Sequence, residues 1–287
     1  MRPEAQDPAA CKLCGSKDLT VFAHTARCRG CRGLLYWPYP DPGALGIEGG
    51  PEAVQRMYRE WYLQSVTFNH DIYTHAVRAT IPESQRGDSL EILDYGGGGG
   101  QFAFVAKSHF FMSKVYITDR HDDALIPEWA PENEPIPHAD FAADDTVFDH
   151  IFMVGVFEHL EDPLGVLRQL AAKLAPEGRI FIDTPRQFWI YPLLRALPVK
   201  GPYERLLRGN VSLAHLQIWS DRSFDGVVSQ AGLRFHKRYP GSEFTMPADF
   251  YLDRMNITNP LLRAAGHAFY RSAKYIARNK IFAVLSR

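Results

Sequence analysis

The sequence predicts an α/β protein built around a doubly wound parallel sheet. From Glu91 onward, apolar segments of strand length alternate with segments of helical periodicity, the pattern of a parallel sheet covered by helices. The first strand, 91–95, leads directly into five consecutive glycines at 96–100, and a helix is expected over 100–108. A strand, a glycine turn and a helix in this order predict a nucleotide-type cofactor site at the carboxyl end of the strand. Glycines suit this turn because a Cβ atom would hinder close approach of the backbone to a ligand.

The other elements are expected in the same alternation. Further strands are predicted near 114–118, 149–154, 178–183 and 233–239, with a weak strand near 135–138 and a final one at 281–285. Further helices are predicted near 163–174 and 221–231. Apolar residues at helical spacing also predict one or two helices over 52–80, which would cap the cofactor domain.

Length and composition limit the class of protein. The chain has 287 residues, room for one α/β domain of about 200 residues with appendages. Its net charge is −1, so it has no bulk electrostatic attraction to nucleic acid. No apolar run reaches the ~18 residues of a membrane span, and the first ten residues lack the pattern of a signal peptide. We therefore expect a cytoplasmic protein.

Four cysteines, the only ones in the chain, form two C-x2-C pairs separated by thirteen residues: Cys11, Cys14, Cys28 and Cys31. Four thiolates at this spacing predict a tetrahedral zinc ribbon. Because four protein ligands leave no open coordination position, the zinc is expected to be structural. Two disulfides or a redox-active pair are the alternatives. A cytoplasmic location does not favour disulfides, and a redox pair needs no second pair.

The glycine turn by itself is compatible with a flexible loop or with a dinucleotide fingerprint, but Gln101 stands where the fingerprint needs its third glycine. Its pattern, Asp-x-Gly-x-Gly-x-Gly, resembles motif I of the class I S-adenosylmethionine (SAM) methyltransferases. The resemblance implies a Rossmann-like class I methyltransferase fold, a seven-stranded sheet flanked by helices, here with a small N-terminal zinc ribbon. It also implies SAM as cofactor, bound by Asp94, Tyr95, Gly96, Gly98 and Gly100.

Three later motifs extend the resemblance over about residues 88–240. They are F-D-x-I at 148–151, E-H-x-x-D-P at 158–163 and L-x-P-x-G at 174–178. In this order they resemble the ubiquinone/menaquinone and type 11, 12 and 23 methyltransferase groupings. None of them is specific for a substrate.

Two acidic positions are candidates for the nucleoside part of the cofactor. Asp119 ends the second strand, 25 residues after Asp94, where a ribose-binding carboxylate belongs in nucleoside-binding α/β folds. The alternative is a solvated turn. The resemblance implies a further residue that meets the adenine amino group, and Asp140 is the candidate, with Phe141 over the purine face. Asp144 or Asp145 could replace Asp140, and a solvated acidic loop is equally compatible.

The candidate catalytic residues are Glu158, His159 and His215. Glu158 and His159 follow a strand, at the edge of the sheet where reacting groups lie in open α/β folds. Histidine has the ordinary pKa of a general base, although His159 could instead bond a carbonyl or the cofactor carboxylate. His215 could contact substrate or pack on a connector. Some quinone O-methyltransferases carry a metal-binding Glu where this chain has Gly155, which argues against a metal-assisted mechanism.

We expect a ribbon at 1–40, a linker with capping helices at 41–84 and a methyltransferase domain at 85–287. The aromatic insertion 186–220 is predicted to build the acceptor pocket, or alternatively to be a helix pair packed on the ribbon. The basic segment 258–278 predicts a helix with its apolar side on the core, or one that lies on an anionic membrane.

The function expected from these features is SAM-dependent methyl transfer to a small-molecule, sugar or lipid-linked acceptor, with oxygen as the favoured atom. The near-neutral charge and the aromatic insertion favour this over nucleic acid. One alternative is an RNA or protein methyltransferase that docks through the ribbon and the basic tail. The other is a catalytically silent binding module. The acceptor and the oligomeric state do not follow from the sequence.

Overall fold

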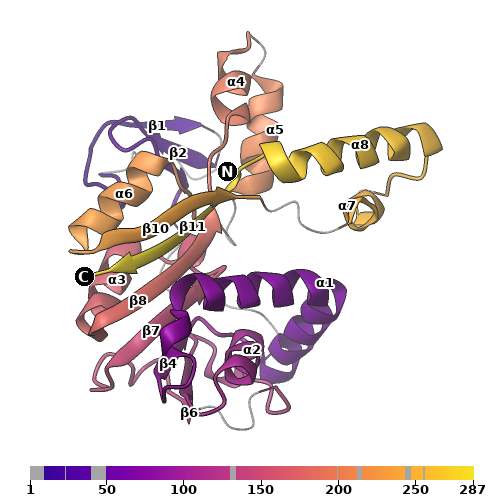
Figure 1. Cartoon of the computed structure of the whole chain (residues 1–287). Helices are drawn as coiled ribbons and strands as arrows, with labels where there is room; N and C mark the ends of the chain where they lie inside the picture. Colours follow the sequence, from indigo (N-terminus) through magenta and orange to yellow (C-terminus); the bar gives the residue numbers. More distant parts are fainter. Residues whose placement is uncertain are drawn as a thin grey trace.

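The computed structural model describes residues 10–22, 24–39, 50–129, 134–198, 200–211, 215–242, 247–254 and 256–287 (Figure 1). The first nine residues and the predicted boundary between ribbon and linker at 40–41 lie outside this description. The side chains of Asp123, Arg205, Arg254 and Lys274 and of residues 61–70 and 208–210 lie outside it as well.

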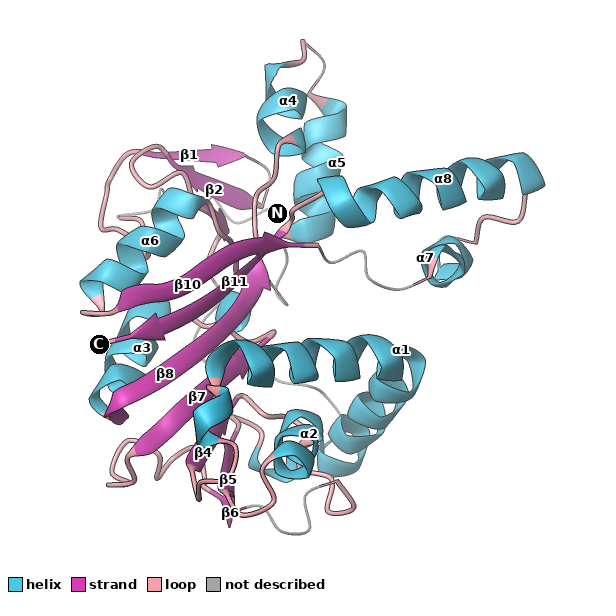
Figure 2. Cartoon of the chain, viewed as in Figure 1, coloured by secondary structure: helices cyan, strands magenta, loops and turns pink. Residues whose placement is uncertain are grey.

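The central sheet confirms the predicted fold class. Its seven strands lie in the order β10-β11-β8-β7-β4-β5-β6 (Figure 2). The pairs among β4, β5, β6, β7 and β8 are parallel, and β11 is antiparallel to both of its neighbours. The strands are β4 (Glu91–Tyr95), β5 (Lys114–Thr118), β6 (Glu134–Pro135), β7 (Phe148–Val154), β8 (Leu174–Pro185), β10 (Arg234–Gly241) and β11 (Lys280–Ser286).

Helices cover both faces of this sheet. Successive strand residues point to opposite faces, so Leu93 belongs to one apolar cluster and Ile92 to the other. The first cluster includes residues of α3 (Pro163–Ala172) and α6 (Asp221–Gln230). The second includes residues of α1 (Gly50–Thr80) and α2 (Gln101–His109). A single helix, α1, therefore fills the predicted 52–80 region. Short 3-10 turns lie at Glu83–Gln85, Asp122–Ala124 and Phe157–His159.

The cysteine-bearing segment forms a second, four-stranded antiparallel sheet. Its strands are β1 (Leu19–Phe22), β2 (Thr25–Cys28), β3 (Leu34–Tyr36) and β9 (Gln217–Ile218). The last of these comes from the methyltransferase part of the chain, because Leu34 pairs with Ile218. Cys11, Cys28 and Cys31 also belong to the same apolar cluster as α3 and α6. The ribbon is therefore packed into the main core.

The insertion after β8 forms α4 (Ile190–Ala196) and α5 (Gly201–Asn210). Tyr191 and Leu207 are buried in one cluster with Leu34 and Ile218, and Phe22 packs on its border. The insertion is therefore a helix pair packed on the ribbon sheet, and its predicted role in building the acceptor pocket stays a prediction.

A second insertion, between β10 and β11, forms α7 (Ala248–Arg254) and α8 (Pro260–Ile276). The expectation that α8 packs its apolar side on the core is wrong for Leu262, Phe269 and Ile276, which are 60%, 58% and 54% exposed. Figure 1 shows α8 extending away from the sheet, with α7 beside it. Within the described ranges, no helix combines the length and the apolarity needed to cross a membrane.

Candidate active site

The glycine turn between β4 and α2 has the backbone geometry that the sequence predicts. Gly96 and Gly98 adopt positive φ angles of 75° and 51°, a region that L-residues with a Cβ rarely enter. An added Cβ would also lie 2.6 Å from Val156 at Gly96 and 2.7 Å from the Tyr58 ring at Gly98. The turn is therefore enclosed by the segment after β7 and by α1, and glycine is required on both grounds.

Two carboxylates stand at this turn. Oδ2 of Asp119 accepts a hydrogen bond from the Gly98 amide at 3.0 Å, and its Oδ1 accepts one from the His121 amide at 2.9 Å. Asp94 is 2% exposed, and its Oδ2 has no hydrogen-bond partner among the described residues. Burial, reinforced by the charge of Asp119, raises the pKa of Asp94 to about 8. Each carboxylate keeps acceptor capacity for a ligand that brings donors.

Helix α1 covers the glycine turn. Its Tyr58 ring lies against Gly98, and burial together with the charges of Asp119 and Asp94 raises the pKa of the Tyr58 phenol. On the same stretch of α1, Gln55 Nε2 donates to the Leu125 carbonyl at 3.1 Å. One turn along, Arg59 Nη2 donates to both carboxylate oxygens of Glu128, at 3.0 and 2.9 Å. The sequence marked this helix as a cap but did not indicate that Tyr58 reaches the turn.

Of the two predicted adenine contacts, the structure leaves Asp140 accessible to a ligand and buries Phe141. Asp140 is exposed in the turn before β7, where a ligand could reach it. Phe141 is 1% exposed, with its ring 5.5 Å from that of Tyr95 and 5.1 Å from Lys173 Nζ, so its position is that of a packing residue. Burial, reinforced by the charge of Asp119, raises the pKa of Tyr95 to about 12. The alternative, Asp144, accepts the Thr146 amide at 2.8 Å and stabilises its own turn.

The three candidate catalytic side chains lie close together, beside the turn that follows β7. Single ligand-type atoms of Glu158, His159 and His215 all lie within 4.8 Å of one another. The two imidazole rings are 5.0 Å apart, centroid to centroid, and meet edge to face. Both histidines are half-buried, whereas Glu158 is 4% exposed. Such a group can move a proton, and its donor set would also suit a divalent metal.

Glu158 is held by neighbours that the sequence did not indicate. Thr184, at the end of β8, donates a hydrogen bond to Glu158 Oε2 at 3.1 Å. Burial raises the pKa of Glu158 and the charge of Asp183 adds to this, while Lys280 and His215 oppose it. Asp183 accepts the Gly155 amide at 2.5 Å and pairs with Lys280, the first residue of β11. The carboxylate in an otherwise apolar strand was the available signal for Asp183.

The connector that carries His215 is fastened to the same turn. The Leu216 amide donates to the Glu158 carbonyl at 2.9 Å. Gln217 Nε2 donates to the carbonyls of Phe157 and Leu160, at 2.8 and 3.0 Å. Because Gln217 also begins β9, these hydrogen bonds connect the ribbon sheet to the catalytic candidates.

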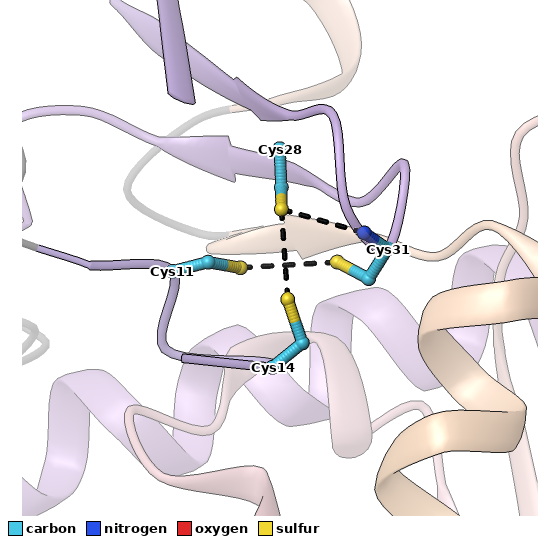
Figure 3. Close-up of side chains that lie close together, drawn as sticks. All are labelled: Cys11, Cys14, Cys28 and Cys31. Carbon is cyan, nitrogen blue, oxygen red and sulfur yellow. Dashed lines mark hydrogen bonds between the residues drawn. The ribbon is translucent and has the colours of Figure 1, made fainter. Parts of the chain in front are cut away.

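The four cysteines form a compact cluster (Figure 3). The Sγ atoms of Cys11 and Cys31 are 3.8 Å apart, and those of Cys14 and Cys28 are 3.5 Å apart. In a regular tetrahedron with Zn–S bonds of about 2.3 Å, neighbouring sulfurs are about 3.8 Å apart. These spacings suit a tetrathiolate metal site and are far longer than a disulfide bond of about 2.05 Å.

The fold and this site together define a class of protein, because a sheet of this order with a glycine turn after its first long strand is the Rossmann-like class I methyltransferase fold. The family model described as "Methyltransferase domain", type 23, matches residues 67–237, more than half of the chain. The chain belongs to this methyltransferase family. A comparison with curated proteins gives no match.

Solved structures support the fold at low sequence identity. A chain from the complex between the Trm112 methyltransferase activator of Haloferax volcanii and a methyltransferase superposes with a TM-score of 0.56 at 13% identity, covering 84% of this chain and 99% of that one. The cyclopropane synthase MmaA2 from Mycobacterium tuberculosis gives 0.54 at 14% identity, covering 76% and 83%. Coclaurine N-methyltransferase, solved with N-methylheliamine and SAH, gives 0.50 at 12% identity, covering 76% and 70%.

Proposed function

We propose that this protein transfers a methyl group from SAM to oxygen of a small-molecule, sugar or lipid-linked acceptor. The observation that carries the proposal is the contact between two turns at one edge of the sheet. The glycine turn meets the turn that bears Glu158 and His159 through Gly96 and Val156. A cofactor site and a group capable of proton transfer are thereby adjacent, as a transfer reaction requires.

The residues at the glycine turn fit SAM chemically. SAM carries an ammonium group and two ribose hydroxyls, which are hydrogen-bond donors. Asp94 Oδ2 is a buried acceptor without a partner among the described residues, and Asp119 keeps lone pairs on both oxygens. We assign the ribose hydroxyls to Asp119 and the purine edge to Asp140. When bound, SAM would supply an activated methyl group to the acceptor.

The acceptor side supports oxygen as the methylated atom. A hydroxyl must lose its proton as the methyl group arrives, and a neutral imidazole can accept that proton. His159 and His215 are half-buried at the site, and Glu158 lies within reach of both. We assign proton acceptance to one of the two imidazoles and its orientation to Glu158. The remaining contribution is alignment of the acceptor with the methyl group.

The cysteine cluster fits a structural zinc ion. Four protein thiolates complete a tetrahedral shell and leave no position for substrate. Cys11, Cys28 and Cys31 are at most 5% exposed, which keeps solvent away from the sulfurs. We propose that this zinc holds the ribbon sheet, including β9, in place.

Calorimetric titration of S-adenosylhomocysteine into the zinc-loaded protein tests the cofactor assignment. Asp119→Ala should weaken binding about tenfold or more, roughly 1.4 kcal/mol, because both ribose contacts are lost. Asp88→Ala removes an equal charge from an exposed residue before β4, at the opposite edge of the sheet, and should leave the dissociation constant unchanged. Binding that Asp119→Ala leaves intact would overturn the ribose assignment. If the folded protein does not bind S-adenosylhomocysteine, the catalytically silent binding module becomes the favoured function.

A further inference from the structure

Helix α8 exposes one continuous apolar face. Leu262, Phe269 and Ile276 follow one another at intervals of seven residues, two helical turns, so they line one side. Leu261 and Tyr275 flank this line and are 80% and 74% exposed. An exposed apolar face of this length on a soluble-type domain marks an interaction site.

The opposite side of α8 is anchored, so the helix is held with its apolar face outward. Arg263 pairs with Asp249 and Asp253 of α7, and His267 Nε2 lies 3.1 Å from Asp249 Oδ1. Gly266 packs closely on Leu252, where an added Cβ would be 2.4 Å from the leucine. Part of the predicted basic face is thus turned to α7, and the apolar face is presented away from it.

The exposed surface continues onto α4. Trp189 Nε1 donates to the Ile276 carbonyl at 3.3 Å and joins the two insertions. Trp189, Leu193 and Leu197 are 53%, 51% and 42% exposed. Both insertions leave the sheet at the edge that carries the active site, because β10 and β8 are each antiparallel to β11 and end at the same edge. We call the exposed apolar residues of α4 and α8 the α4–α8 surface.

The charge around this surface identifies its partner. From Arg254 to Arg287 the chain has seven Lys and Arg and no Asp or Glu, and of these Arg263 and Lys280 are paired with acids of other segments. Arg271 and Arg278 are exposed at the α8 end, and Arg195 and Lys200 are exposed on and after α4. Apolar side chains bordered by cations match the acyl boundary and the headgroups of an anionic bilayer.

We propose that the α4–α8 surface docks on an anionic lipid bilayer and brings the active-site edge of the sheet to the membrane. This inference deepens the proposed function, and it rests on that function for one consequence. The acceptor is then a molecule held in the membrane, of the lipid-linked class, whose polar group reaches Glu158, His159 and His215 from the headgroup layer.

Vesicle flotation with the full zinc-loaded chain tests the docking. Wild-type protein should float with vesicles of phosphatidylcholine and about 30% phosphatidylglycerol, and less with phosphatidylcholine alone or at high salt. The triple variant Leu262→Glu, Phe269→Glu, Ile276→Glu should bind about tenfold or more weakly, because apolar burial and charge attraction are both lost.

A matched triple variant provides the control. Phe111, Met112 and Val147 are 76%, 59% and 53% exposed and precede β5 and β7, at the opposite edge of the sheet. Changing these three to Glu alters charge and apolar exposure equally and should leave flotation at the wild-type level. Equal loss in both triple variants would overturn the proposal, because charge alone would then explain it.

Two further readouts separate the remaining outcomes. If the wild type is a dimer by light scattering, does not float, and becomes a monomer in the α8 triple variant, a second copy covers this face and the proposal is wrong. S-adenosylhomocysteine binding, measured in all variants, reports the proposed function independently. Cofactor binding without flotation would overturn only the proposed membrane docking. Flotation without cofactor binding would overturn only the proposed function.

Discussion

The two halves of the active-site edge are built in different ways. In the proposed cofactor half, the core is one contiguous stretch in which Asp94 and the glycine turn are six residues apart at most, with Asp119 of the next strand and Tyr58 of α1 added to it. The acceptor half gathers Glu158, Thr184, His215 and Lys280 from four separate elements. It also depends on the ribbon sheet, through the pairing of β3 with β9.

The geometry of the first half is set by local sequence, whereas the geometry of the second is set by contacts between distant segments. Backbone conformation at the glycine turn follows from residue type, because only glycine tolerates those φ angles without strain. The acceptor half is positioned by burial and by hydrogen bonds between distant segments. We therefore expect perturbation of the ribbon to damage the acceptor half, and perturbation of the turn to act on the cofactor.

The largest effect should follow loss of the proposed zinc site. Three of the four cysteines are buried in the main apolar cluster, so an empty or altered site exposes core surface and frees β3. Cys28→Ser should lower the free energy of unfolding by more than about 5 kcal/mol and Tm by roughly 10 °C or more. Circular dichroism melts with and without a chelator measure this, with zinc content determined in parallel.

Thr20→Ser, a conservative change at an exposed position of β1, is the control for this comparison. It should keep one zinc per chain and the wild-type Tm. A Cys28→Ser protein that melts like the wild type would break the proposed dependence of the acceptor half on the ribbon.

The next effect concerns the pH dependence of stability at Asp94. Its pKa is about 8 in the folded protein and 3.8 in the reference state, so the folded state binds the proton more tightly. The stability that this group contributes is complete below about pH 4 and is lost as the pH rises through about 8. Between about pH 5 and pH 8 the change is about 3–4 kcal/mol, at about 1.4 kcal/mol per pH unit.

Asp94→Asn removes this dependence and should gain stability over the wild type as the pH rises. Thermal unfolding at both pH values measures the difference, and Asp122→Asn, at an exposed residue, should show no such trend. A wild type and an Asp94→Asn variant that differ by the same amount at both pH values would show that Asp94 is ionised normally.

The smallest expected effect comes from replacing one glycine in each of the two turns, the glycine turn after β4 and the turn after β7. Gly98 and Gly155 both have positive φ, 51° and 66°, but only Gly98 has a neighbour that an added Cβ would strike. Gly155→Ala should cost about 1–2 kcal/mol for the backbone alone. Gly98→Ala should cost about 1–3 kcal/mol more, because the Tyr58 ring must move. Urea unfolding measures both, and equal costs would mean that Tyr58 yields freely.

The outcome of the sequence predictions follows the same division. The central strands and the helix near 163–174 were predictable, because periodicity is a local signal. Asp162 accepts the Gly165 amide at 2.9 Å, as an N-cap should. The strand β2 had no clear signal in the sequence, because Thr25–Cys28 is short and ends at the candidate zinc ligand Cys28.

Other features had no local signal. Nothing near Gln217 indicates that its side chain holds the turn at 157–160, since the two are 57 or more residues apart. The exposed side of α8 was equally hidden, because amphipathic periodicity shows that a helix has an apolar face but not what covers it. The acids of α7 decide the orientation here, through Arg263.

The sequence by itself determined the class of fold, the glycine turn with its carboxylates and the four-cysteine pattern, because residue type and spacing constrain the backbone directly. Only the tertiary structure decided that the ribbon shares the main core, that Tyr58 covers the turn, and that Glu158, His159 and His215 meet. The physical reason is that burial and side-chain hydrogen bonds join segments far apart in the chain, and such contacts leave no periodic trace in the sequence.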